Sequence, residues 1–285
     1  MNGNLLLDTS AVRSISLEKL KRISDKDCVL LVSPYSFWEI LCHLDEEQKF
    51  NRFKIELIKF KNFSILDDPF GITAKYIKDH NSVIKDRVED HEMIQGAISV
   101  LAKSSSIDEF HSSFFVDSNN NTRQIQDCVK RGRKILAAAS NSYRGFVSKI
   151  IDSIKCNNSK YETAYDRHIL ILSLIDGCVR SIEAQGGNRS EFETKLINEI
   201  YVYFSYILHR SLEYLKYNNS NIDPNDYEDS RICQHLSLDS AVIFITNDKH
   251  FYDSVNSTIN LLTTLNDNDF ITSIKVEKTD FLNTW

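Results

Sequence analysis

The 285-residue chain contains only three prolines and eight glycines, and it has no low-complexity tract or internal repeat. Little of the chain can therefore be disordered linker, and we expect an ordered, helix-rich protein. Its six cysteines are scattered, and none forms a Cys-x-x-Cys pair. This pattern is typical of free thiols in a reducing compartment and does not indicate a disulfide framework or a zinc site.

Long apolar segments are also missing. Residues 1–7 have neither the basic start nor the long apolar core of a signal peptide. The most apolar stretch, residues 168–175, is far too short to span a bilayer. The sequence therefore predicts a cytoplasmic protein with no membrane partner.

Basic residues are not in excess, since the formal net charge is −6. This balance argues against a protein with a basic surface that binds nucleic acid non-specifically. The charge is uneven, however, because residues 121–160 carry +7 and the remainder −13. The part of this window with the most basic residues could bind a phosphate backbone, with Tyr143 and Phe146 stacking on bases. The alternative is that these residues form a solvent-exposed helix face. Its basic residues are Lys130, Arg131, Arg133 and Lys134.

Short apolar runs near both ends of the chain predict buried strands. The run at 241–245 does not alternate, as expected of a central parallel strand covered on both faces. Ser33 and Pro34 predict the cap and first residue of a helix. Strands that alternate with helices imply a parallel α/β sheet with right-handed crossovers. The five predicted strands are 5–7, 28–32, 63–66, 241–245 and 270–276.

The middle of the chain has almost no strand signal and contains apolar residues at helical spacing, most clearly from Phe192 to Leu215. Ser190 and Glu193 predict a capping box at the start of that helix. Polar clusters at 118–121 and 218–221 predict loops. We therefore divide the chain into an α/β core, residues 1–70 and 225–285, and an all-helical insertion of four to six helices, residues 71–224.

Four acidic residues occupy informative places. Asp8 and Asp248 end the first and fourth strands, Glu39 lies on the helix after the second, and Asp229 precedes a short helix at 230–236. The carboxyl ends of parallel strands share one sheet edge, so these residues can converge there. Carboxylates that lie close together repel one another, so they stay ionised at low free-energy cost only when cations lie beside them. Carboxylate oxygens are the hard ligands that Mg²⁺ or Mn²⁺ prefers. Each acid also has a structural alternative, as a helix cap or a surface residue.

Two motifs resemble those of PIN-domain nucleases. Residues 5–10, Leu-Leu-Leu-Asp-Thr-Ser, resemble the family's opening strand, which delivers Asp-Thr-Asn. Residues 245–251, Ile-Thr-Asn-Asp-Lys-His-Phe, are similar to its threonine-x-aspartate motif. Residues 34–39 resemble the second acidic position, and Asp229 fits the third, for which Asp226 and Glu228 are rivals.

The resemblance covers residues 1–68 and 225–285, and it implies a PIN-like parallel sheet and a metal-dependent endoribonuclease. Mg²⁺ or Mn²⁺ would be bound by the catalytic residues, while the Thr246 and Ser10 hydroxyls would orient Asp248, water or phosphate. Cleavage would leave a 5′-phosphate and a 3′-hydroxyl. The implied catalytic and metal-binding residues are Asp8, Glu39, Asp229 and Asp248.

The sequence departs from the family pattern in two ways. Ser10 stands where asparagine is usual, and the helical insertion at 71–224 is far larger than a minimal PIN domain carries. The expected partners are RNA, with tRNA and mRNA as candidates, an inhibitory or activating protein, and a second copy of the chain. By family analogy the setting is a bacterial toxin or phage-defence effector. The alternatives are a PIN-derived binding module that does not cut and a DNA-directed, structure-specific nuclease.

Overall fold

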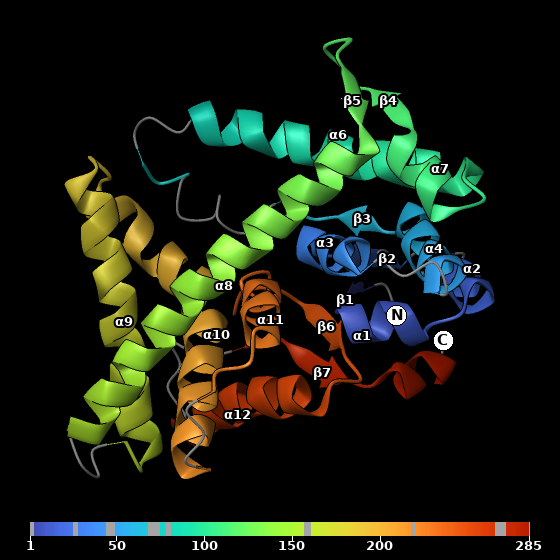
Figure 1. Ribbon diagram of the computed structural model, residues 1–285. Helices are drawn as coiled ribbons and strands as arrows, with labels where there is room; N and C mark the ends of the chain where they lie inside the picture. The colour runs from blue at the N-terminus through green and yellow to red at the C-terminus, as the bar shows by residue number, and fades with distance from the viewer. Residues whose placement is uncertain are drawn as a thin grey trace.

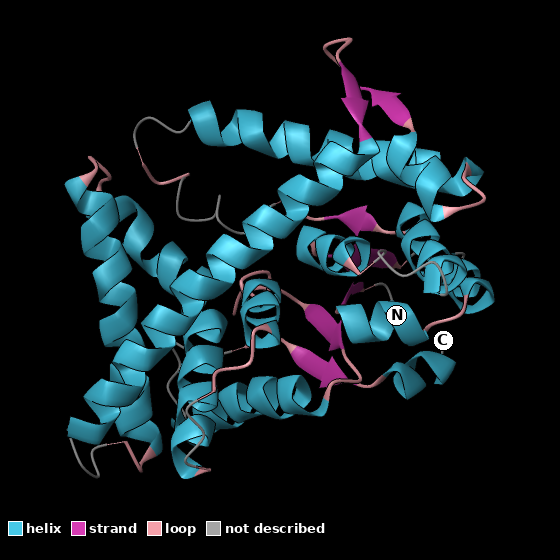
Figure 2. Cartoon of the chain, viewed as in Figure 1, coloured by secondary structure: helices cyan, strands magenta, loops and turns pink. Residues whose placement is uncertain are grey.

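The computed structural model is a parallel sheet surrounded by helices (Figures 1 and 2). It describes residues 3–24, 28–43, 49–67, 75–77, 81–156, 161–217, 221–265 and 272–284. The sheet has the order β3-β2-β1-β6-β7, and all its neighbouring strands are parallel. Its strands are β1 (Asn4–Leu7), β2 (Val29–Val32), β3 (Ser64–Ile65), β6 (Val242–Ile245) and β7 (Lys275–Glu277).

The central strand, β1, is buried on both faces. Leu5 and Leu7 belong to one hydrophobic cluster, and Leu6 between them belongs to the other. This explains why the run is apolar without alternation. The expectation of a parallel α/β sheet is confirmed. The last strand is shorter than predicted, because β7 begins at Lys275, while residues 266–271 lie outside the described part of the chain.

Helices connect the strands of the sheet. Ser33 caps α3, accepting a 3.3 Å hydrogen bond from the Tyr35 N–H, and Pro34 is the first helical residue, as predicted. None of the described helices is long and apolar enough to cross a membrane. The connecting elements are α1 (Thr9–Ser14), α2 (Leu17–Ser24), α3 (Pro34–Cys42), α4 (Phe50–Ile58), η2 (Lys59–Asn62), α11 (Asn225–Cys233), α12 (Lys249–Leu265) and η4 (Thr279–Thr284).

The middle segment contains five helices within its described residues, in the predicted range. It also contains an antiparallel hairpin that the sequence did not predict, because strands of three residues are too short to show a period. The polar cluster at 118–121 forms its turn, where Asp117 accepts from the Asn119 and Asn121 N–H groups. The elements are α6 (Asn81–Lys103), α7 (Ile107–Ser112), β4 (Phe114–Val116), β5 (Thr122–Gln124), α8 (Ile125–Cys156), α9 (Ala164–Ala184) and α10 (Arg189–Lys216).

The predicted capping box of α10 is wrong. Asn188 is the N-cap, so Ser190 already lies in the first turn, and its hydroxyl donates to the Asn188 side chain. Glu193 instead pairs with Arg189 one turn earlier, at 2.7 Å.

Both hydrophobic clusters contain residues from the predicted α/β core and from the segment 71–224. One cluster joins Leu6 and Phe244 of the sheet to α9, α10, α11 and α12, and the other joins Leu5 and Leu7 to α1, α3, α4, α6 and α7. The long helix α8 contributes to both clusters and crosses the molecule diagonally in Figure 1. The middle helices therefore pack directly on the sheet and on its connecting helices.

The contact of α8 with α3 depends on Gly132. A Cβ atom at this position would lie 2.8 Å from a ring carbon of buried Trp38, whereas a Cβ at Gly145 on the same helix would meet open space. We expect Gly132→Ala to lower the free energy of unfolding by about 1–3 kcal/mol through overpacking. Gly145→Ala should raise it by about 0.5–1 kcal/mol. Urea unfolding measures both, and equal effects would contradict the close approach of the helices.

Candidate active site

The ends of β1 and β6 meet at one edge of the sheet. Leu7 is paired with Ile245 in the parallel register, so Asp8 and Thr246 are the next residues along two neighbouring strands. The Asp8 N–H extends the ladder by donating to the Ile245 carbonyl at 3.2 Å. The two PIN-like motifs thus lie side by side, although they are far apart in the sequence.

Asp8 is held by a dense set of donors. Thr246 Oγ1 donates to its Oδ2 at 2.6 Å, and the Ala11 N–H donates to its Oδ1 at 2.7 Å. Ser10 Oγ lies 2.9 Å from both oxygens. Asp8 is therefore the N-cap of α1, as the structural alternative proposed, and its carboxylate also faces the end of β6.

Ser10 and Thr246 also hold the turn that carries Asp248. Ser10 Oγ accepts from the N–H groups of Asn247 at 2.8 Å and Asp248 at 3.1 Å, and Thr246 Oγ1 accepts from the Asp248 N–H at 3.0 Å. Asp248 caps α12, because its Oδ1 accepts from the Phe251 N–H at 2.8 Å. Within the described residues, its Oδ2 accepts no hydrogen bond. The half-buried Asp248 thus has one oxygen oriented and one available.

Asp229 and Glu39 reach this edge from α11 and α3. Two contacts join these helices: His235 Nε2 lies 3.1 Å from Ser33 Oγ, and the Tyr227 hydroxyl lies 3.4 Å from the Tyr35 hydroxyl. The alternative role of Asp229 as an N-cap is wrong. The helix extends from Asn225 to Cys233, so Asp229 lies inside it.

The acidic residues influence one another electrostatically. The pKa of Asp229 is raised well above its ordinary value, first by burial and then by the charges of Asp8, Asp248 and Glu39. Burial raises the pKa of Asp8 to about 7, although hydrogen bonds from Thr246, Ala11 and Ser10 oppose the shift. Carboxylates in this situation favour the uptake of a cation or of protons.

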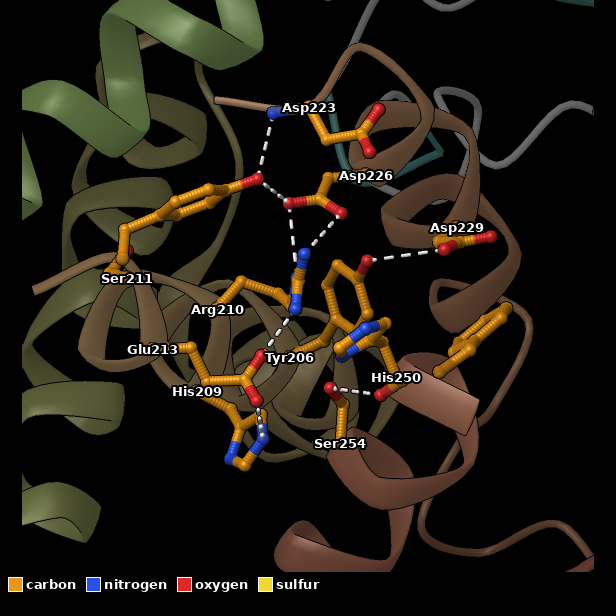
Figure 3. A network of polar contacts seen from close by, with 12 residues as sticks. Tyr206, His209, Arg210, Ser211, Glu213, Asp223, Asp226, Asp229, His250 and Ser254 are labelled. Carbon is orange, nitrogen blue, oxygen red and sulfur yellow. Dashed lines mark hydrogen bonds and ion pairs between the residues drawn. The ribbon is translucent and has the colours of Figure 1, made fainter. Parts of the chain in front are cut away.

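The structure separates the rivals for the third acidic position. Asp226 is bound by Arg210 through both of its oxygens at 3.0 Å and by the Tyr214 hydroxyl at 2.5 Å (Figure 3). Asp229, at the other side of the same network, accepts a hydrogen bond from the Tyr206 hydroxyl at 3.4 Å (Figure 3). Glu228 is hydrogen-bonded to Glu39, and burial together with the Glu39 charge raises the pKa of Glu228 to about 9. Asp229 and Glu228 therefore face the other acids, and Asp226 is committed to an ion pair.

These side chains fit a hard divalent cation by their chemistry, since all are oxygen donors and burial and mutual charge raise the pKa values of Asp8 and Asp229. Their present spacing is looser than that of a ligand set. Within the described residues, no three His, Cys, Asp or Glu side chains form a group that could hold a metal ion. We call the sheet edge near Asp8, Glu39, Asp229 and Asp248 the acidic edge. Arg13 is a cation that contacts it, since its Nη1 lies 3.4 Å from Glu39 Oε1.

Sequence reasoning missed Arg13. It lies in the last turn of α1, the helix that begins at Asp8. Its spacing from Asp8 does not indicate this contact, because residues three or four positions apart share a helix face and residues five apart do not.

The basic residues of the middle segment lie on α8. Lys130, Arg133 and Lys134 are exposed and Arg131 is half-buried. Arg133 donates to the Cys42 carbonyl, at the end of α3, at 3.4 Å. This places the basic face beside the helix that carries Glu39.

The expectation that Tyr143 and Phe146 stack on bases is not supported by the structure. Tyr143 is buried against Tyr227, with 6.1 Å between ring centroids, and Phe146 packs on Phe204 at 6.1 Å. Tyr143 belongs to the hydrophobic core, and the half-buried Phe146 packs against it.

The burial of His235 should make stability depend on pH. Burial lowers the pKa of folded His235 from 6.5 to about 3. The unfolded chain therefore binds a proton at a pH where the folded protein does not, and stability present above pH 6.5 is lost as the pH falls. Between about pH 6 and 4, we expect the unfolding free energy of the wild type to fall about 1 kcal/mol per pH unit more steeply than that of His235→Gln.

Urea unfolding at a series of pH values measures this difference in slope. The control is His250→Gln, because His250 is exposed and its substitution should leave the wild-type slope unchanged. Parallel slopes for the wild type and His235→Gln would show that His235 is not held neutral by the fold.

Comparison with known proteins assigns no family. No protein-family model, curated protein or solved structure matches the chain. The likeness to PIN domains therefore rests on the motifs around Asp8 and Asp248, and the function has to be inferred from the chemistry of the sheet edge.

Proposed function

We propose that the chain is a PIN-like, metal-dependent endoribonuclease whose active site is the acidic edge of the sheet. The observation that carries this proposal is geometric: β1 and β6 end at one edge of the sheet, where Thr246 donates to Asp8 and Ser10 accepts from the Asp248 N–H. The charges of Asp8, Asp248 and Glu39 also act on Asp229, which comes from α11. A helix cap needs no second carboxylate beside it. Gathering four of them is costly unless a cation offsets their charge, which favours a metal-binding role.

The residues of the site have distinct parts in this mechanism. Asp8, Glu39, Asp229 and Asp248 would hold Mg²⁺ or Mn²⁺, which would supply Lewis-acid activation of water and of the phosphodiester. Thr246, Ser10 and the Ala11 N–H fix the Asp8 carboxylate, so that it does not need to reorganise. Asp248 is oriented through one oxygen and leaves the other for binding. The products, as the family resemblance implies, carry a 5′-phosphate and a 3′-hydroxyl.

Neutralising either strand-end acid should abolish cleavage without unfolding the protein. We expect Asp8→Asn and Asp248→Asn to lower the cleavage rate more than about 100-fold, since even partners of metal ligands contribute about 10- to 100-fold. Asparagine is a good N-cap, so both helix starts should persist. Cleavage of a labelled single-stranded RNA in Mn²⁺ measures the rate, and circular dichroism verifies the fold.

The matched control is Asp239→Asn, because Asp239 is an exposed aspartate just before the start of β6, at the opposite end of that strand from Asp248. It should retain wild-type cleavage. Full activity in both Asp8→Asn and Asp248→Asn would refute the assignment. Single-stranded DNA and flapped duplexes, assayed beside RNA, identify a DNA-directed nuclease if they are cut faster.

A second candidate is a PIN-derived module that binds nucleic acid or protein without cutting. Two observations favour it. Asp8 and Asp248 both cap helices, and the acidic side chains of the described residues are not spaced as metal ligands. RNA binding without Mn²⁺ binding, measured by calorimetry, would support this candidate over the nuclease.

The basic face of α8 should contribute to RNA affinity. Replacing exposed Lys130 and Lys134 by glutamine should reduce the slope of log affinity against log salt by about 1.4, since each phosphate contact on a single strand contributes about 0.7. Fluorescence anisotropy at several salt concentrations measures the slope. The control pair, Lys195→Gln and Lys216→Gln on α10, removes the same charge from exposed positions on another helix. An equal effect of both pairs would mean that only net charge matters.

A further inference from the structure

Arg13 faces the acidic edge from the end of α1. Its Nη1 lies 3.4 Å from Glu39 Oε1, and its Nε lies 3.4 Å from Glu56 Oε2. Its charge also acts on Glu228, whose pKa it lowers against the larger effects of burial and Glu39. Arg13 is thus the counter-ion of Glu39, the acid on α3.

Neither of these ion pairs is a well-formed hydrogen bond. Charge-assisted N–H···O contacts are about 2.7–2.9 Å long, and both separations exceed this range. Nε of Arg13 and Oε2 of Glu56 are buried and lack hydrogen-bond partners within the described chain. The guanidinium therefore has donors that Glu39 and Glu56 do not satisfy, in a planar arrangement that matches phosphate oxygens.

The backbone beneath Arg13 is fixed even though its side chain is loosely held. Buried Lys59 donates to the carbonyls of Val12 at 2.8 Å and Arg13 at 2.9 Å, which closes the end of α1. Glu56 also accepts from Arg52 Nε at 3.0 Å through its other oxygen. Glu56 would therefore keep a cationic partner if Arg13 moved, and the movement would leave α1 in place.

We propose that Arg13 is a phosphate-contacting residue that is held on Glu39 until the site binds metal. A divalent cation bound by Glu39 would neutralise the carboxylate, and the Arg13 guanidinium would then lose its partner. The phosphodiester backbone is the charge-matched ligand for the released group. This inference rests on the proposed nuclease function and adds a residue that selects for the phosphate of the substrate.

The test is Arg13→Gln, with Arg22→Gln as the control. Arg22 is an exposed arginine on α2 that pairs with Glu18 one turn earlier. Titration calorimetry gives the Mn²⁺ affinity, and anisotropy in Ca²⁺ at several salt concentrations gives the affinity for a single-stranded RNA, whose integrity a gel verifies. Arg13→Gln should bind Mn²⁺ about tenfold more tightly, because binding no longer breaks an ion pair. It should bind RNA more weakly, with a salt slope smaller by about 0.7.

Arg22→Gln should match the wild type in both measurements. Weaker Mn²⁺ binding with unchanged RNA binding in Arg13→Gln would overturn the proposal, since Arg13 would then only position Glu39. If the wild type binds Mn²⁺ and RNA and Arg13→Gln is identical, the proposal for Arg13 fails and the nuclease stands. If neither protein binds Mn²⁺ or RNA, the proposed function itself fails. Should Arg13→Gln not fold, Arg13→Gln with Glu56→Gln removes the buried carboxylate that faced Arg13 and repeats the test.

Discussion

The hydrogen bond from Thr246 to Asp8, 2.6 Å long, joins residues that are 238 positions apart. It exists because β1 and β6 are parallel neighbours with Leu7 opposite Ile245, so the first polar residue after each strand emerges at the same point. The contacts of Ser10 with the Asn247 and Asp248 N–H groups depend on the same pairing. A shift of one residue in register would turn Asp8 away from Thr246 and move its carboxylate to another face of the sheet.

The middle helices take part in the site through α11. The Arg210 and Tyr214 side chains of α10 bind Asp226, and the Tyr206 hydroxyl approaches Asp229 (Figure 3). This network fixes α11 from the side away from the sheet, while His235 and Tyr227 fix it to α3. The position of Asp229 is therefore decided jointly by the segment 71–224 and by the α/β elements, which agrees with the hydrophobic clusters that both parts share.

Charge at the acidic edge is compensated unevenly. Asp8 receives several neutral donors, whereas Glu39 relies on Arg13 and Asp229 receives only a long contact from Tyr206. Burial without strong partners raises the pKa of Asp229, and a shared hydrogen bond with Glu39 contributes to the raised pKa of Glu228. Such imbalance is costly for folding alone, and it is common where a site is prepared to bind a ligand.

The sequence by itself determined the strands of the sheet, the cap of α3 and the strand-end positions of Asp8 and Asp248. These features follow from local periodicity and from residues with strong local preferences, so neighbouring residues suffice to specify them. Tertiary structure alone decided three others: that Asp226 is bound by Arg210, that Asp229 lies within a helix, and that Arg13 faces Glu39. The two ion pairs depend on how separate helices pack against each other, and no local pattern of residues encodes which partner a charged side chain will meet. The helix boundary depends on where α11 starts, and sequence patterns define the ends of helices poorly.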